Sequence, residues 1–185
     1  MTALTPANQL TLLRMLLIPA FAILVTYGYI GSALVTFIVA GITDMLDGLI
    51  ARRTGQKTTL GAWLDPMADK LLLATTFVVL TLPLEHMINR IPLWLTLLIL
   101  SRDVGIVATV AIINLAVGRR TFTPSIFGKV ATATYIATGL VTLYFNYLGR
   151  TSALVGVFVY LSLAITLVSG LHYLSRATRL SSTQG

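Results

Sequence analysis

The sequence has no cysteine and few charged residues. The absence of cysteine from all 185 residues excludes disulfides and thiolate metal sites, and it removes any indication of the redox state of the compartment. Only 10% of the residues are charged, whereas a soluble domain carries about 25%. Because 56% of the residues are also hydrophobic, the composition excludes an ordinary soluble domain and indicates a membrane protein.

The charged residues that are present are mostly basic, and the formal net charge is +7. A basic stripe would favour nucleic-acid binding. Here the basic residues are scattered between apolar segments, so no nucleic acid is expected as a partner. Basic loops held on the cytoplasmic side of a membrane and attracted to anionic lipid explain the charge instead.

Long, continuous apolar segments recur along the chain. Each can cross a hydrocarbon core about 30 Å thick, and continuous apolar runs favour helices over alternating strands. The sequence therefore predicts an all-α, polytopic integral membrane protein that forms a single domain over residues 1–185. The six predicted transmembrane helices are 9–29, 32–51, 60–83, 91–117, 125–147 and 152–175.

The loops differ in basic residues between the two sides of the membrane. One side holds Arg90 and Arg150 alone. The side that carries the N-terminus holds Arg52, Arg53, Lys57, Arg119, Arg120, Arg176 and Arg179. Because basic residues are retained on the cytoplasmic side, we expect both termini in the cytoplasm, with the protein in the inner membrane of a bacterial cell.

Acidic residues are scarce, and four of them lie together in the sequence. The chain has six acidic residues, which are Asp44, Asp47, Asp65, Asp69, Glu85 and Asp103. The first four fall within 26 residues, at the predicted cytoplasmic ends of the second and third spans. Ionisable groups are costly inside a membrane, so they indicate a functional site.

The spacing of these aspartates predicts a metal site. Asp44 and Asp47 are three residues apart and Asp65 and Asp69 are four apart, so each pair shares a helix face. A short loop joins the two spans, which predicts antiparallel neighbours whose carboxylates converge. Four such carboxylates repel one another, and a divalent cation removes the conflict. Hard oxygen ligands suit Mg²⁺ or Mn²⁺.

Three other interpretations are compatible with buried aspartates. They can form structural ion pairs with Arg52, Lys70 or Arg102, or belong to a non-catalytic membrane scaffold. They also mark ion paths, as in an ion or proton-coupled transporter. The position of the carboxylates near one membrane face, away from the midplane, argues against the transporter.

The residues around the aspartates form a longer pattern. It reads Asp44-x-x-Asp47-Gly48-x-x-Ala51-Arg52, then eight residues, then Gly61-x-x-x-Asp65-x-x-x-Asp69. This pattern resembles the complete signature of the CDP-alcohol phosphatidyltransferase family. A weaker resemblance covers most of the chain, including Asn8-x-Leu10-Thr11-x-x-Arg14.

The resemblance implies six membrane helices around a polar cavity open to the cytoplasm, in a homodimer. It implies transfer of a phosphatidyl group from CDP-diacylglycerol to an alcohol, with release of CMP. In such an enzyme Asp44, Asp47 and Asp65 would bind one or two metal ions. Asp69 would lie near the ions and act as the general base. The residues that would shape the CDP site are Gly48, Ala51, Arg52 and Gly61.

The identity of the alcohol depends on weaker signals. The opening segment resembles family members whose acceptor is glycerol 3-phosphate, and a phosphate needs a basic pocket. The candidate residues for this pocket are Arg102, Lys129, Arg119 and Arg120. The Arg102-Asp103 pair, however, is similar to family members that form cardiolipin with phosphatidylglycerol as acceptor. It can also be a structural ion pair, and Lys129 can simply extend to the interface.

Overall fold

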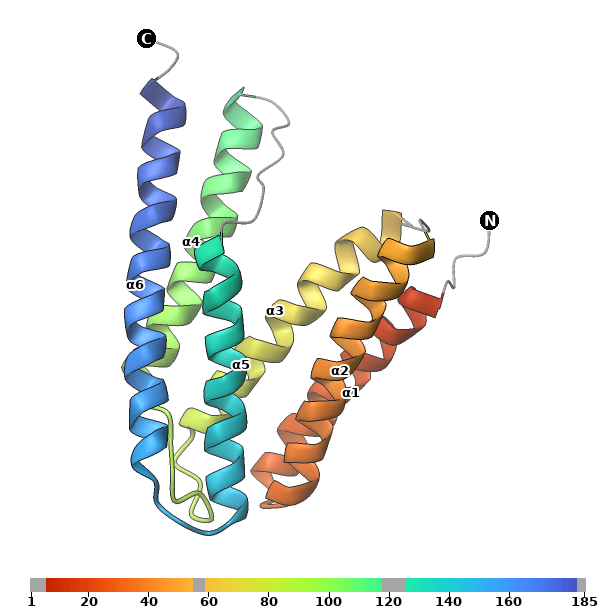
Figure 1. The fold of residues 1–185 in the computed structure, drawn as a ribbon, viewed down its shortest axis with the longest axis vertical. Helices are drawn as coiled ribbons and strands as arrows, with labels where there is room; N and C mark the ends of the chain where they lie inside the picture. Colours follow the sequence, from red (N-terminus) through yellow and green to blue (C-terminus); the bar gives the residue numbers. More distant parts are fainter. Residues whose placement is uncertain (1–5, 55–58, 118–125, 183–185) are drawn as a thin grey trace. The chain divides into compact units, whose positions relative to one another are not determined.

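The computed structural model describes residues 6–54, 59–117 and 126–182, with described side chains at 9–47, 67–109 and 126–173. The described residues form six α-helices and no strand (Figure 1). The helices are α1 (Pro6–Thr26), α2 (Ile30–Thr54), α3 (Thr59–Thr81), α4 (Leu93–Val117), α5 (Ile126–Tyr147) and α6 (Ala153–Ser182).

The prediction of an all-α membrane protein is confirmed. Each helix corresponds to one predicted span, and α6 continues to Ser182, beyond the predicted end at residue 175. Within the described residues, four stretches are long and apolar enough to cross a membrane. They are Gln9–Thr26, Ile30–Asp47, Ile126–Tyr147 and Ala153–Tyr173. The chain is therefore an integral membrane protein, and membrane spans at α3 and α4 remain a prediction.

The chain divides into two compact units. The first comprises Met1–Arg90 with Gly139–Ser152, and the second comprises Ile91–Thr138 with Ala153–Gly185. In the first unit, α1 packs against both α2 and α3. Phe21 of α1 and Phe37 of α2 are buried, with ring centroids 5.6 Å apart, and their contact helps to hold these two helices together.

Two buried asparagines, one in the loop after α3 and one near the end of α5, hydrogen-bond to each other in the first unit. The side chain of Asn146 accepts a hydrogen bond from the backbone N–H of Asn89 and donates one to its carbonyl, each at 2.8 Å. The Asn89 side chain donates to the carbonyl of Arg150 at 2.7 Å and accepts from the backbone N–H of Ser152 at 3.2 Å. These bonds fasten the loop after α3 to the turn that follows α5.

The variant Asn146→Leu should lower the free energy of unfolding by about 2–3 kcal/mol, because both buried backbone groups of Asn89 lose their partner. The measurement is the unfolding midpoint in detergent. Thr36→Val is the control, since it removes an exposed bond within α2 (2.8 Å to the carbonyl of Ser32) and should shift the free energy by no more than about 0.5 kcal/mol. Equal effects of the two variants would show that the asparagine pair contributes no special stability.

In the second unit, hydroxyl groups join α5 to α6, and α4 packs against α6. The Tyr135 hydroxyl lies 2.6 Å from that of Thr166, and the Thr138 hydroxyl lies 2.8 Å from that of Ser162. Hydrogen bonds between polar side chains are a common means of helix association in membranes, where hydrophobic burial drives association less than in water. They fix the facing surfaces of α5 and α6.

Candidate active site

A buried arginine from α1 lies at the aspartates of α2. Arg14 is fully buried, at 0% exposure. Its Nη1 lies 2.8 Å from Oδ1 of Asp44, and its Nη2 donates a hydrogen bond to Oδ2 of Asp47. Thr11, one helical turn before Arg14, places its hydroxyl 3.5 Å from the same Asp47 oxygen. Arg14 therefore holds both aspartates of the first motif segment on one guanidinium.

The two aspartates differ in their exposure. The side chain of Asp47 is 4% exposed, whereas that of Asp44 is 40% exposed. Asp47 is thus enclosed between α1 and α2, while Asp44 pairs with Arg14 and still has an open side. Arg14 contacts both groups at once, through a hydrogen bond from Nη2 to Asp47 and an ion pair between Nη1 and Asp44.

The exposed side of Asp44 is what makes this cluster fit a metal ion. Its side chain pairs with Arg14 and is still 40% exposed. Carboxylate oxygens are the ligands that Mg²⁺ and Mn²⁺ prefer. The open side of Asp44 therefore fits a divalent cation.

Arg14 was not among the predicted site residues. In the described part of the chain, Arg14 pairs with Asp44 and Asp47, and Arg102 pairs with Asp103. The alternative of ion pairs with Arg52 or Lys70 stays a prediction. One signal could have identified Arg14. Arg14 is the only charged residue of the first predicted span, and an ionisable group inside a membrane needs a partner.

Asp69 is half-buried on α3, and α3 packs against the helix that carries Arg14. Gly48, Ala51 and Arg52 continue α2 after Asp47, and the first turns of α3 hold Gly61 and Asp65. The side chains of these five residues lie outside the described part of the chain. Among described side chains, no three His, Cys, Asp or Glu residues lie close enough to bind one metal ion. The predicted convergence of four aspartates therefore stays a prediction.

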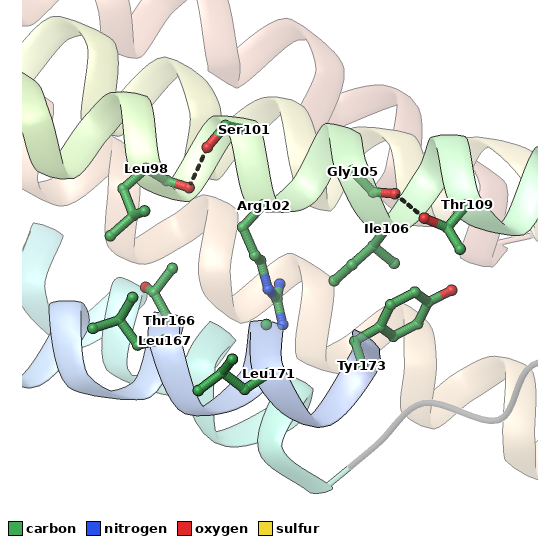
Figure 2. Close-up of a pocket in the computed structure, with 11 residues that line it drawn as sticks. Leu98, Ser101, Arg102, Gly105, Ile106, Thr109, Thr166, Leu167, Leu171 and Tyr173 are labelled. Atoms are coloured by element: carbon green, nitrogen blue, oxygen red, sulfur yellow. Dashed lines mark hydrogen bonds between the residues drawn. The ribbon is translucent and has the colours of Figure 1, made fainter. Parts of the chain in front are cut away.

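The predicted acceptor residues have different surroundings. Arg119 and Arg120 lie outside the described residues. Lys129 is exposed in the first turn of α5. In the second unit, Arg102 of α4 pairs with Asp103 at 2.6 Å and donates a hydrogen bond to the Ser169 hydroxyl of α6. Figure 2 shows Arg102 extending from α4 toward α6 in a pocket of about 350 Å³.

Comparison with known proteins shows a family match over most of the chain. A family model described as CDP-alcohol phosphatidyltransferase matches residues 4–168. A protein named "Probable phosphatidylglycerophosphate synthase" from Mycobacterium tuberculosis is 36% identical over 181 residues, which cover 94% of this chain and 81% of the relative. The range that the family model matches includes Arg14 and all four aspartates.

Two further relatives match shorter parts. The Escherichia coli protein named "CDP-diacylglycerol--glycerol-3-phosphate 3-phosphatidyltransferase" is 47% identical over 81 residues, which cover 42% of each chain. The human protein named "Cardiolipin synthase (CMP-forming)" is 41% identical over 107 residues, which cover 57% of this chain and 34% of the relative.

Proposed function

This chain belongs to the CDP-alcohol phosphatidyltransferase family, and we propose that it transfers the phosphatidyl group of CDP-diacylglycerol to glycerol 3-phosphate. The products are phosphatidylglycerophosphate and CMP. The observation that carries the choice of acceptor is the 36% identity, over 81% of its length, with a relative named as a phosphatidylglycerophosphate synthase. The name of the Escherichia coli relative states the same acceptor.

In the proposed reaction, the acceptor hydroxyl oxygen attacks the phosphorus that carries diacylglycerol, and the bond from this phosphorus to the CMP oxygen breaks. Asp69 takes the proton of the hydroxyl as general base. The residues proposed to contact the acceptor phosphate are Arg102, Lys129, Arg119 and Arg120. Gly48, Ala51, Arg52 and Gly61 line the CDP site in this proposal.

One or two Mg²⁺ or Mn²⁺ ions are proposed at Asp44, Asp47, Asp65 and Asp69. When bound, such ions neutralise the diphosphate and stabilise the leaving CMP oxygen. Arg14 contributes by holding Asp44 and Asp47 in position through its two ion pairs. The arrangement keeps the ligands preorganised, which avoids reorganisation during the reaction.

The proposed setting is a homodimer in the bacterial inner membrane, with six spans, both termini and the active-site cavity on the cytoplasmic side. Helix length supports spans at α3 and α4, which have 23 and 25 residues, because about 20 residues cross the hydrocarbon core. The basic loops support the orientation. CDP-diacylglycerol joins polar CDP to apolar diacylglycerol, and this junction lies at the membrane interface. The carboxylates are proposed at the same depth.

The test is CMP release from CDP-diacylglycerol by the purified protein in detergent with Mg²⁺. Glycerol 3-phosphate should drive release, phosphatidylglycerol should not, and removal of the metal with EDTA should stop it. A reaction without acceptor is the control for hydrolysis. Release that persists in EDTA would contradict the metal proposal, whereas the absence of release with any common alcohol acceptor would contradict the reaction itself.

Phosphatidylglycerol is the second candidate acceptor. It is favoured by the Arg102–Asp103 ion pair at 2.6 Å and by the name of the human relative, of which this chain covers 34%. CMP release driven by phosphatidylglycerol alone would establish this alternative and leave the family reaction intact. Family membership explains the aspartates, so an ion or proton transporter is not needed to account for them. A transporter would predict ion flux across vesicles, and Asp69→Asn would abolish that flux.

A further inference from the structure

The pocket of about 350 Å³ between α4 and α6 has two chemically different parts. Leu98 and Ile106 of α4 and Leu167 and Leu171 of α6 form apolar walls. Arg102 and Tyr173 supply the polar part, and Figure 2 shows both side chains with these apolar residues around them. The volume falls within the range of small-molecule sites, which is about 300–1,000 Å³.

The side chain of Arg102 is buried, and one of its N–H groups has no hydrogen-bond partner among the described residues. Its side chain is only 9% exposed. Nη1 donates to Asp103 and Nη2 to Ser169, whereas the buried Nε has no hydrogen-bond partner among the described residues. A guanidinium has five N–H donors, and a buried donor without a partner is costly. The pocket thus contains a charged group that lacks a ligand for at least one donor.

The Tyr173 hydroxyl adds a second donor without a partner. Its oxygen is buried and has no hydrogen-bond partner within the described part of the chain. Tyr173 lies three residues before Arg176 in the sequence of α6, and tyrosine is common where a membrane span reaches the headgroup region. A ligand that satisfies both donors must supply acceptor oxygens at this depth.

The charge of the site selects among phosphate groups. Asp103 neutralises Arg102 at 2.6 Å, and its side chain is only 17% exposed. A phosphate dianion would meet this carboxylate at close range, and like charges repel strongly in a site of low polarity. A phosphodiester carries one negative charge and still offers two oxygens to an arginine fork. The apolar walls then accommodate a hydrocarbon chain attached to the diester.

We infer that the α4–α6 pocket binds a membrane phospholipid, with its phosphodiester at Arg102 and Tyr173 and part of one acyl chain against Leu98, Ile106, Leu167 and Leu171. The inference goes beyond the proposed reaction, because it assigns a lipid site in addition to that of CDP-diacylglycerol. Arg102 then contacts a lipid phosphate, which leaves Lys129, Arg119 and Arg120 for the phosphate of a soluble acceptor.

The proposed lipid site can be tested by replacing a glycine of the pocket with a larger residue that fills it. Gly105 and Gly170 line it, and a Cβ added at either would meet no atom within 4 Å. Gly170→Leu therefore places a side chain in the pocket without forcing the backbone to move. Gly156 also lies on α6, also has no atom within 4 Å of an added Cβ, and is not a lining residue. Gly156→Leu is the matched control, since both changes raise helix propensity equally.

The experiment is native mass spectrometry of the delipidated full chain titrated with phosphatidylglycerol, without CDP-diacylglycerol. Gly170→Leu should weaken binding of the tightest phosphatidylglycerol by about tenfold or more, and Gly156→Leu should leave it unchanged. The double variant Arg102→Gln with Asp103→Asn leaves no unpaired charge and should weaken phosphatidylglycerol binding to a similar degree. Tyr173→Phe should weaken the same binding to a smaller degree. Diacylglycerol, which lacks the phosphate, should not compete.

Three results would overturn the inference. Equal binding to the Gly170→Leu and Gly156→Leu variants would place the lipid elsewhere on the surface. Full displacement of the lipid by free glycerol 3-phosphate would assign Arg102 to a soluble phosphate, as in the acceptor role described above. Phosphatidylglycerol is also the second candidate acceptor, so phosphatidylethanolamine, which has the same phosphodiester and is not a candidate acceptor, is titrated in parallel. It should bind with the same dependence on Gly170, whereas binding of phosphatidylglycerol alone would assign the pocket to the acceptor and overturn the inference.

Discussion

Arg14→Met should lower the free energy of unfolding by about 3–5 kcal/mol, because it removes one partner of a buried ion pair and leaves the other uncompensated. The uncompensated group is Asp47, whose side chain is 4% exposed. The measurement is the unfolding midpoint of the purified protein in detergent. Activity should fall as well, since Asp44 and Asp47 lose the group that positions them.

Two further variants separate charge from geometry at Arg14. Arg14→Lys keeps the charge but loses the planar fork that binds Asp44 and Asp47 together, so its effect should be intermediate. Arg14→Met combined with Asp47→Asn removes the buried uncompensated charge and should recover part of the stability.

The control for Arg14 is Arg90→Met, because Arg90 is exposed in the loop after α3. It should change the free energy of unfolding by no more than about 0.5 kcal/mol. An Arg14→Met variant as stable as Arg90→Met would mean that the ion pairs at Asp44 and Asp47 do not stabilise the fold.

Asp69→Asn should reduce CMP release by about 10²–10⁴-fold, the usual contribution of a general base. Asparagine preserves the size of the side chain but cannot accept the proton of the acceptor hydroxyl at neutral pH. Turnover with Mg²⁺ and binding of CDP-diacylglycerol are measured on the same sample. A base predicts that binding survives while turnover is lost.

Glu85→Gln is the matched control for Asp69, because Glu85 is an exposed acidic residue in the loop after α3 and has no proposed role. Its CMP release should equal that of the unmodified protein. Loss of both binding and turnover in Asp69→Asn would identify Asp69 chiefly as a metal ligand. Turnover that remains within about threefold of the unmodified protein would exclude it as the base.

Much of the fold follows from local chemistry and was therefore predictable. Every predicted span corresponds to a helix, since continuous apolar runs in a membrane have to satisfy their backbone hydrogen bonds internally. The helix α6 continues to Ser182, beyond the predicted span 152–175, because its last residues are polar and basic and carry no hydropathy signal for a span. The asparagine pair of Asn89 and Asn146 was not predicted, since 57 residues separate its members.

The sequence by itself determined the reaction class, through the resemblance of the pattern from Asp44 to Asp69 to a family signature. The spacing of the aspartates on helix faces predicted a metal site, and this spacing is a local property that survives any arrangement of the helices. Only the tertiary structure decided what surrounds these groups. Arg14 reaches Asp44 and Asp47 because α1 packs against α2 with one particular rotation about its axis. Similarly, Arg102 reaches Ser169 because α4 packs against α6. Such rotations depend on the packing of whole helix surfaces, which no short stretch of sequence specifies.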